Sequence, residues 1–312
     1  MDRTVGTGRH LGVDVGGTKV AFRVEDEGAD PYEMSFSWQE WHERRSAEAD
    51  LAQLAEAVGE LRARTGAPAD GPPGSGFRAV GVAMPATVAP SGRVRAWPSR
   101  PEWAGVDLGA SLRGLFPEAR VGWADDGDLG ALAEAAAAGC DRLLYLGVGT
   151  GVGGGFVDRD GGIAGPGRPS FEIGHLIVDR DGALCVCGRR GCLQALASGP
   201  ATLRRAARTR GARVGFEELR AGVAAGAPWA AGAVDETAAA LAAAVVGVSE
   251  LLHPRLTLVG GGFADRMPGL VDAVAGHVSR LTRPGGPVAP VRAATLGGLS
   301  SLRGACVLAR EL

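Results

Sequence analysis

The sequence has almost no lysine, few aromatic residues and no excess of charge of either sign. Lys19 is the only lysine among 312 residues, and aromatic residues make up 5% of the chain. Lysine and arginine together number 33 against 35 aspartates and glutamates, which gives a formal net charge of -2. This balance excludes a strong overall field that would attract nucleic acid or anionic lipid. Any anionic ligand must therefore be held by local geometry.

Long apolar segments and a secretory leader are also missing. No uninterrupted apolar stretch reaches the ~20 residues that cross a bilayer. The first ten residues lack the apolar core and cleavage site of a signal peptide. We therefore expect a cytoplasmic protein with no membrane or nucleic-acid partner. Thiols stay reduced in the cytoplasm, so the close group Cys185, Cys187 and Cys192 predicts a metal site rather than disulfides.

Glycine is abundant, with 51 residues, about twice the usual ~7%. Because alanine, glycine, arginine and proline have GC-rich codons, we take the alanine runs as evidence for helix alone. The chain is 46% hydrophobic and 22% charged, which excludes a disordered or fibrous protein. Its 312 residues are enough for about two ordinary domains.

Strand-like and helix-like segments alternate along the whole chain. The spacing of apolar residues, together with proline and glycine at the breaks, predicts the element bounds. Expected strands are 11–16, 20–24, 80–84, 119–123, 142–146, 156–157, 255–259 and 290–294, and expected helices are 47–65, 105–116, 128–138, 200–209, 216–224, 230–252, 267–280 and 304–312. Residues 25–46 are expected to be mostly loop. This alternation predicts an α/β fold with two sheets.

Three of the expected strands run directly into glycine-rich turns. Glycines let backbone N–H groups approach a phosphate closely. In the first turn, Gly16 and Gly17 are followed by the hydroxyl of Thr18 and the charge of Lys19. Asp14, just before them, offers a carboxylate that could hold Mg²⁺. A plain β-turn remains the alternative for this segment taken alone.

Two further glycine-rich turns follow expected strands, which argues against a chance occurrence of glycine in the first turn. Gly149, Thr150 and Gly151 begin a second loop that again combines glycine with a threonine hydroxyl. Gly260 and Gly261 follow a third strand and could lie beside a nucleobase or ribose. Two phosphate loops about 130 residues apart are what a nucleotide held between two related domains requires.

Four residues form a candidate metal site. His175 with Cys185, Cys187 and Cys192 supplies one imidazole and three thiolates, the ligand set of a closed tetrahedral zinc site. Because protein fills all four positions, the zinc is expected to be structural and to brace the loop that begins at Glu172.

An acidic cluster provides candidates for a general base. Asp125, Asp126 and Asp128 lie where a strand ends and a helix begins, which is where ligands bind in α/β folds. Phosphoryl transfer to a hydroxyl needs a carboxylate that accepts the proton. Any of the three could serve, and a solvated acidic helix cap is the structural alternative.

Taken together these motifs resemble the ROK family (repressors, open reading frames and kinases) of sugar kinases. The resemblance covers nearly the whole chain in order. Its motifs lie at Asp14–Lys19, Gly149–Gly155, Glu172–His175, Cys185–Cys192 and His253–Gly262. It implies an actin-like ATPase (ribonuclease H-like) fold, with two α/β domains and a cleft between them. We place the small domain at residues 1–122 plus 295–312 and the large, zinc-binding domain at 123–294.

The resemblance also assigns roles. It implies ATP as phosphoryl donor, Mg²⁺ near Asp14, Gly260 and Gly261 on the adenosine side, and a homodimer. Aligning the family's later glutamate with Glu134 puts its catalytic aspartate on Asp126, which would accept the proton of a primary hydroxymethyl group. The sugar contacts of the family fall on Asp125, Asp126, Glu172, His175 and Gln194.

The sugar contacts depart from the family pattern while the catalytic and nucleotide motifs are intact. Asp125 stands where asparagine is usual and Gln194 where glutamate is usual. Ala86 replaces a glycine, and Trp97 lies in a stretch that usually carries a sugar-facing asparagine. Altered hydrogen-bonding partners discriminate strongly between substrates. We therefore expect a modified hexose or a valiolone-type C7 cyclitol.

Other functions remain as alternatives. An ordinary glucokinase or an N-acyl amino-sugar kinase would use the same motifs. A sugar-binding regulator without catalysis is a further possibility, as is a DNA-binding repressor. The repressor is disfavoured because about ten residues precede Gly12, too few for a helix-turn-helix domain.

Overall fold

The computed structural model describes residues 8–38, 46–66, 75–158, 170–287 and 289–312. The described chain divides into two compact units. The first comprises the described residues of Met1–Leu129 and Ser300–Leu312, with Ser170. The second comprises those of Gly130–Ile163 and Phe171–Leu299.

The first unit is built on a five-stranded sheet of mixed direction, ordered β3-β2-β1-β4-β7. The hairpin partners β1, β2 and β3 are antiparallel, whereas β4 and β7 run parallel to β1. The strands are β1 (His10–Val15), β2 (Lys19–Glu25), β3 (Tyr32–Ser37), β4 (Ala79–Ala83) and β7 (Arg120–Ala124). A small second ribbon pairs β5 (Thr87–Val88) with β6 (Val94–Ala96).

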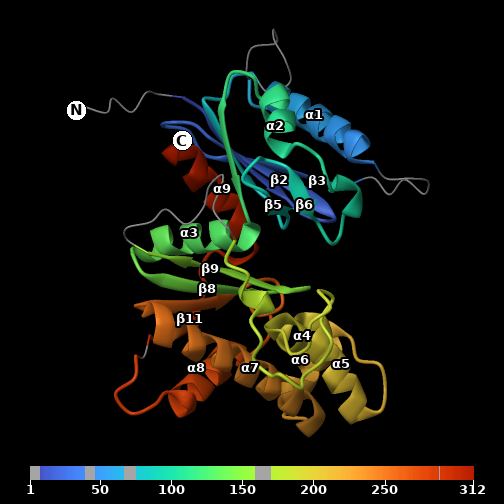
Figure 1. The fold of residues 1–312 in the computed structure, drawn as a ribbon, viewed down its shortest axis with the longest axis vertical. Helices are drawn as coiled ribbons and strands as arrows, with labels where there is room; N and C mark the ends of the chain where they lie inside the picture. Colours follow the sequence, from blue (N-terminus) through green and yellow to red (C-terminus); the bar gives the residue numbers. More distant parts are fainter. Residues whose placement is uncertain (1–7, 39–45, 67–74, 159–169, 288) are drawn as a thin grey trace. The chain divides into compact units, whose positions relative to one another are not determined.

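Helices cover the sheet of the first unit. α9 (Ser300–Glu311) packs on β1 and β4, and its Cys306 side chain lies against Gly12. α1 (Ala47–Arg64) and α2 (Leu108–Leu115) contribute apolar residues to a core shared with β1, β2 and β4. α1 begins where the Ser46 hydroxyl accepts a hydrogen bond from the Ala49 N–H, an N-cap. Figure 1 shows these elements around the strands.

The second unit has a four-stranded sheet ordered β11-β10-β8-β9, in which only β9 is antiparallel to its neighbour. The strands are β8 (Leu143–Val148), β9 (Val152–Val157), β10 (Leu256–Gly260) and β11 (Val291–Ala293). The helices are α3 (Asp126–Ala138), α4 (Leu193–Ala197), α5 (Gly199–Arg210), α6 (Phe216–Ala224), α7 (Pro228–Leu252) and α8 (Leu270–Leu281), the first turn of α3 belonging to the first unit.

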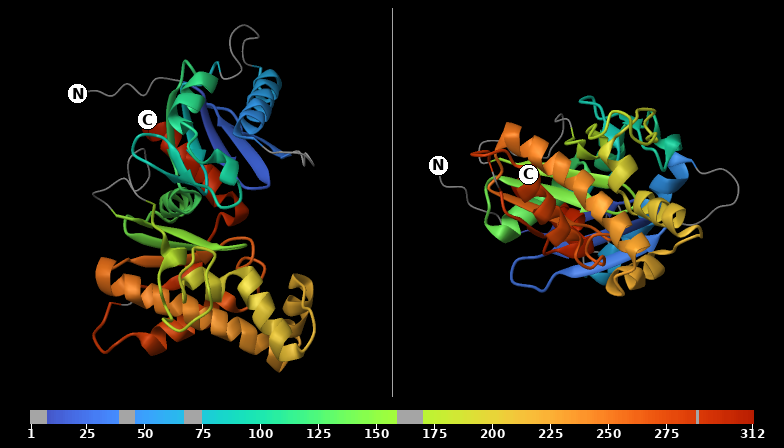
Figure 2. Two further views of the ribbon diagram at one scale, coloured as in Figure 1. Left: turned by 45° about the vertical axis from the view of Figure 1, so that its right-hand side comes forward. Right: turned by 90° about the horizontal axis from the view of Figure 1, so that it is seen from below.

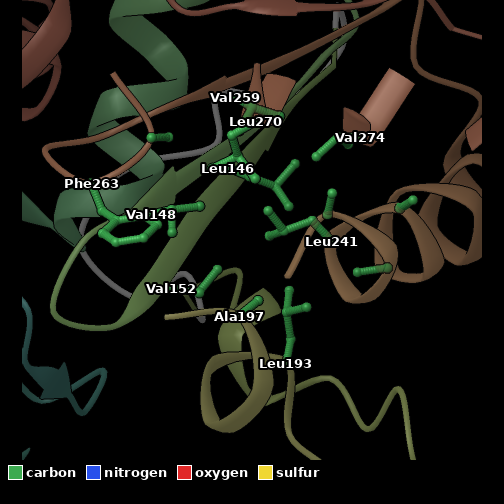
Figure 3. Packing of buried hydrophobic residues seen from close by; sticks show 14 of the residues in the cluster. Leu146, Val148, Val152, Leu193, Ala197, Leu241, Val259, Phe263, Leu270 and Val274 are labelled. Carbon is green, nitrogen blue, oxygen red and sulfur yellow. The ribbon is translucent and has the colours of Figure 1, made fainter. Parts of the chain in front are cut away.

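Two layers of side chains cover this second sheet. Its main core joins strand residues such as Leu146 and Val259 with Leu241 of α7 and Leu270 of α8 (Figure 3). A smaller cluster joins alanines of α3 to Leu143 and other strand residues. Figures 1 and 2 show α7 and α8 side by side on one face of the sheet and α3 on the other.

By length and composition α7 could cross a membrane, which by itself is weak evidence because core helices of soluble proteins pass the same test. Its buried residues pack into the main core of the second unit. Asp235 and Glu236 interrupt its apolar sequence.

Besides the short β5, β6 and α4, which were not predicted, two elements differ clearly from the sequence prediction. β3 forms within the segment expected to be loop, because Tyr32, Met34 and Phe36 alternate with polar residues and pack on the first core. β9 begins at Val152, so that most of the second glycine run is strand rather than loop. A Cβ on Gly154 would lie 2.2 Å from the Tyr145 carbonyl oxygen, so glycine there serves close strand packing.

Candidate active site and metal centre

The first glycine loop, Gly16–Lys19, connects β1 to β2 in the first unit. The Gly16 N–H donates to the Lys19 carbonyl oxygen at 2.9 Å, which closes the loop. Thr18 and Lys19 are exposed, and both glycines are partly exposed. The loop is therefore a tight turn with an accessible hydroxyl and ammonium, as a phosphate site requires.

Two carboxylates interact near this loop. Asp14 is a partly buried residue near the end of β1, and Asp126 is the first residue of α3. Burial, followed by the charge of Asp126, raises the pKa of Asp14 to about 7, against an opposing effect of Lys19. The structure thus brings the predicted base, the predicted magnesium ligand and the predicted phosphate-binding lysine into one electrostatic group.

Asp125 caps the helix that carries the predicted base. Its Oδ1 atom accepts from the Gly127 N–H at 3.0 Å, and its carbonyl oxygen accepts from the Leu129 N–H at 3.0 Å. The carbonyl oxygen of Asp126 accepts from the Ser301 hydroxyl at 3.0 Å. Of the acidic cluster, Asp125 therefore serves as the helix cap, and Asp126 is fixed at the start of α3.

In the second unit, the second glycine loop lies beside the third. The Gly149 N–H donates to the Gly151 carbonyl oxygen at 2.9 Å, and the Gly149 carbonyl oxygen accepts from Gly199 at 2.9 Å. Gly261 has a φ of +92°, and a Cβ there would lie 2.7 Å from the Val148 nitrogen. Only glycine fits such a left-handed and crowded position. Gly260 precedes it at the end of β10, so these two predicted nucleotide loops adjoin.

The four predicted metal ligands converge in the second unit. The ligand atoms of His175, Cys185, Cys187 and Cys192 all lie within 4.8 Å of one another. Cys185 Sγ is 3.8 Å from His175 Nδ1, and Cys187 Sγ is 3.6 Å from Cys192 Sγ. Two sulfurs bound to one tetrahedral zinc at ~2.3 Å are about 3.8 Å apart. The donor set and its spacing therefore fit zinc.

The state of the thiols also suits a metal centre. Backbone and side-chain hydrogen bonds from Arg189 lower the pKa of Cys187 to about 6, which favours its thiolate at neutral pH. Burial raises the pKa of the Cys192 thiol to about 11. A bound cation would offset the cost of ionising Cys192, because metal ligation requires deprotonated thiols.

Gln194 lies between the metal cluster and the second glycine loop. It is in the first turn of α4, where its Nε2 atom donates to Cys185 Sγ at 3.4 Å. Its Oε1 atom is 3.0 Å from where a Cβ on Gly151 would stand. His175 ends the short turn Ile173–His175, and Glu172 is exposed just before it. The predicted sugar contacts of the second unit thus border its metal centre.

One group of buried polar residues was not expected from the sequence. Arg100, Asp50 and Trp38 contact one another or the first glycine loop in the first unit. They come from three segments separated by at least ten residues, so no local motif marks them. The only signal is an arginine between two prolines and two tryptophans, at Trp97–Trp103.

Comparisons with known proteins agree with the motifs. The sequence model of the ROK family matches residues 10–312. The kanosamine kinase of Amycolatopsis mediterranei (strain S699) is 59% identical over 305 residues, covering 98% of this chain and 97% of the relative. A glucokinase of Streptomyces coelicolor is 29% identical over 330 residues, covering 97% and 98%.

Solved structures agree as well. A ROK hexokinase from Thermus thermophilus superposes with a TM-score of 0.81 at 30% identity, over 96% of this chain and 97% of that one. A ROK glucokinase from Streptomyces griseus, solved with glucose and AMPPNP, gives 0.76 at 26% identity over 98% and 100%. The two-sheet architecture and these neighbours confirm the predicted actin-like ATPase fold. The chain belongs to the ROK family.

Proposed function

We propose that this chain is an ATP-dependent kinase that phosphorylates the primary hydroxyl of an amino-hexose such as kanosamine. The observation that carries the proposal is the 59% identity to a kanosamine kinase over 98% of the chain. The glucokinase relatives support the broader class of sugar phosphotransferase with a hydroxyl acceptor. We further propose a cytoplasmic homodimer.

The roles proposed for the first unit are supported by the charges near its glycine loop. Asp126 accepts the proton of the attacking hydroxyl, while Thr18, Lys19 and the loop amides stabilise the charge on the phosphoryl group. Asp14 supplies the oxygen ligand that magnesium prefers. The raised pKa of Asp14 reports mainly the cost of burying its charge and, after it, the repulsion from Asp126; a bound divalent cation would offset both. When bound, magnesium would neutralise phosphate charge.

The second unit supplies the remaining contacts. The N–H groups of Gly149–Gly151 are proposed to bind phosphate, and Gly260 and Gly261 the adenosine side. Glu172, His175 and Gln194 are proposed to bind sugar hydroxyls, with the zinc-braced loop holding the first two. All four zinc positions are filled by protein, so zinc is assigned no step in the reaction.

Asp125 gives a physical reason for an amino-sugar acceptor. Its capping bond to Gly127 uses Oδ1, and the amide oxygen of asparagine would cap the helix equally well. The negative charge at position 125 is therefore not required for capping. A carboxylate beside the acceptor would attract a substrate ammonium that an asparagine amide would not.

A kinetic panel tests the proposal. ADP release is measured with kanosamine, glucose, glucosamine, N-acetylmannosamine and a valiolone-type cyclitol, and kcat/KM is compared. We expect kanosamine to be preferred over glucose by at least about tenfold, equal to ~1.4 kcal/mol. A higher kcat/KM for glucose or for the cyclitol would overturn the amino-sugar assignment. Sugar binding without ADP release from any acceptor would indicate the non-catalytic alternative.

The Asp125→Asn variant tests the charge argument separately. It keeps the helix cap and removes one negative charge, so kcat/KM for kanosamine is expected to fall about tenfold while that for glucose holds or rises. An equal change for both sugars would show that Asp125 does not recognise the amine.

A further inference from the structure

The first glycine loop is supported by a buried polar cluster that the proposed chemistry does not use. Its members are Trp38, Asp50, Arg100 and Trp103, whose exposed fractions are 5%, 7%, 1% and 1%. Arg100 lies among apolar side chains of the first core. Burying an ion pair seldom adds net stability compared with apolar packing, so the cluster calls for another explanation.

The cluster holds three successive carbonyl groups of the loop. Arg100 donates from Nε and Nη2 to the Gly17 carbonyl oxygen, at 3.3 and 3.2 Å. The indole Nε1 of Trp38 donates to the Gly16 carbonyl oxygen at 2.8 Å. The backbone N–H of Trp38 donates to the Thr18 carbonyl oxygen at 3.1 Å.

Fixing these carbonyl groups also fixes the amides behind them. In a planar trans peptide, the C=O of one residue and the N–H of the next point in opposite directions. The N–H groups of Gly17 and Thr18 must therefore point away from Trp38 and Arg100. Within the described residues, neither N–H donates to another protein group. Thr18 is exposed as a residue, so a ligand can approach the loop there.

Arg100 itself is held rigidly. Its Nη1 atom lies 2.5 Å from Asp50 Oδ2, and Trp103 Nε1 donates to the same oxygen at 2.7 Å. The guanidinium carbon lies 4.2 Å from the centroid of the Trp38 ring. Because Asp50 balances its charge, Arg100 acts on the loop through directed hydrogen bonds more than through long-range attraction.

We propose that Arg100 and Trp38, supported by Asp50, are positioning residues that orient the Gly17 and Thr18 amides toward the phosphates of the nucleotide. The inference rests on the proposed kinase function and names the device that preorganises its phosphate loop. Donors fixed before the ligand arrives need no reorganisation on binding, so they bind it more tightly.

A matched pair of tryptophan variants tests the proposal. Trp38→Phe removes the indole N–H that holds the Gly16 carbonyl, and Trp103→Phe removes one that reaches only Asp50. Losing one such bond corresponds to a change of about threefold to tenfold. We expect Trp38→Phe to raise both the KM for ATP and the Kd of AMPPNP by this factor and to leave the KM for the sugar within twofold of the wild type. Trp103→Phe is expected to raise neither constant. Equal effects in both variants, or none in either, would overturn the proposal.

A second comparison removes the guanidinium together with the charge of its nearest partner, Asp50, while Glu102, whose Oε1 atom is 3.9 Å from the guanidinium, keeps its charge. In the double variant Arg100→Leu with Asp50→Asn, the amide oxygen at position 50 still accepts from Trp103. We expect KM for ATP to rise about tenfold or more, because the variant loses the two charge-assisted hydrogen bonds from Arg100 to the Gly17 carbonyl oxygen. The control is Arg205→Leu, which removes another buried arginine, bonded to the Leu196 and Ala233 carbonyls of the second unit. It should lower the melting temperature and leave KM for ATP within twofold.

The readouts separate this proposal from the proposed function. AMPPNP binding, measured by calorimetry without sugar, reports the loop even if the wild-type chain phosphorylates none of the acceptors. If the double variant binds AMPPNP as tightly as the wild type, the positioning role is wrong while the kinase assignment stands. If the double variant does not fold, the comparison of Trp38→Phe with Trp103→Phe still tests the positioning role.

Discussion

Replacing Asp14 by asparagine is predicted to stabilise the protein while abolishing its activity. Burial and the charge of Asp126 raise the pKa of Asp14 from 3.8 to about 7. An acid with a raised pKa in the folded state favours folding at low pH, and that contribution is lost as the pH rises from 3.8 to about 7. Asparagine stays neutral throughout, so it escapes that loss.

The magnitude follows from the same pKa. Each pKa unit corresponds to about 1.4 kcal/mol, so ionised Asp14 costs the folded first unit up to about 4 kcal/mol above pH 7. Most of this cost is incurred between pH 5 and pH 8. The unfolding free energy of Asp14→Asn, relative to the wild type, is therefore expected to rise by about 2–3 kcal/mol over that interval.

Urea unfolding followed by tryptophan fluorescence measures this difference. Five of the 6 tryptophans lie within Met1–Leu129, so the signal reports mainly the first unit. The buffers contain no magnesium or nucleotide, because a cation bound at Asp14 would hide the effect. Asp126→Asn should reduce the pH dependence of the wild type without removing it. A stability difference between Asp14→Asn and wild type that is the same at pH 5 and pH 8 would show that ionisation of Asp14 does not destabilise the folded first unit.

Three further predictions concern the second unit. Removing zinc with a strong chelator should release about one ion per chain and lower the melting temperature by at least ~5 °C; protein purified without chelator yet free of zinc would contradict this. Gln194→Glu restores the usual family residue and should raise the kcat/KM ratio of glucose to kanosamine about tenfold, whereas an unchanged ratio excludes Gln194 from selectivity. Gly154→Ala forces a Cβ to 2.2 Å from the Tyr145 carbonyl oxygen and should cost about 1–3 kcal/mol, whereas Gly153→Ala meets nothing within 4 Å. Similar melting temperatures for those two variants would disprove the packing argument.

The features that could be predicted from the sequence depend on residues that lie close together along the chain. Three cysteines within eight positions must lie close in space, and the structure brings them together with His175. The two main sheets could be predicted because buried strands and helices alternate along the chain. The family resemblance, confirmed by the comparisons, depended on the same local motifs.

Features formed by distant residues could not be predicted. Arg100 reaches Gly17 across 83 positions and Asp50 across 50. Gly17 lies in a predicted loop, but no local pattern connects either partner with Arg100. The strand β3 was missed because its alternation of apolar and polar residues is short and follows a polar segment. Asp125 caps α3 because its carboxylate accepts a hydrogen bond from the Gly127 N–H. The spacing of the acidic residues alone does not determine whether Asp125 or Asp126 makes this bond.

The proton-accepting role of Asp126 is tested most directly by single-turnover phosphoryl transfer with the Asp126→Asn variant, saturated with ATP and kanosamine. We predict that nucleotide binding persists while the rate of transfer falls by at least about 100-fold, the usual contribution of a general base. A variant that retains more than about a twentieth of the wild-type rate, well above that expectation, would contradict it.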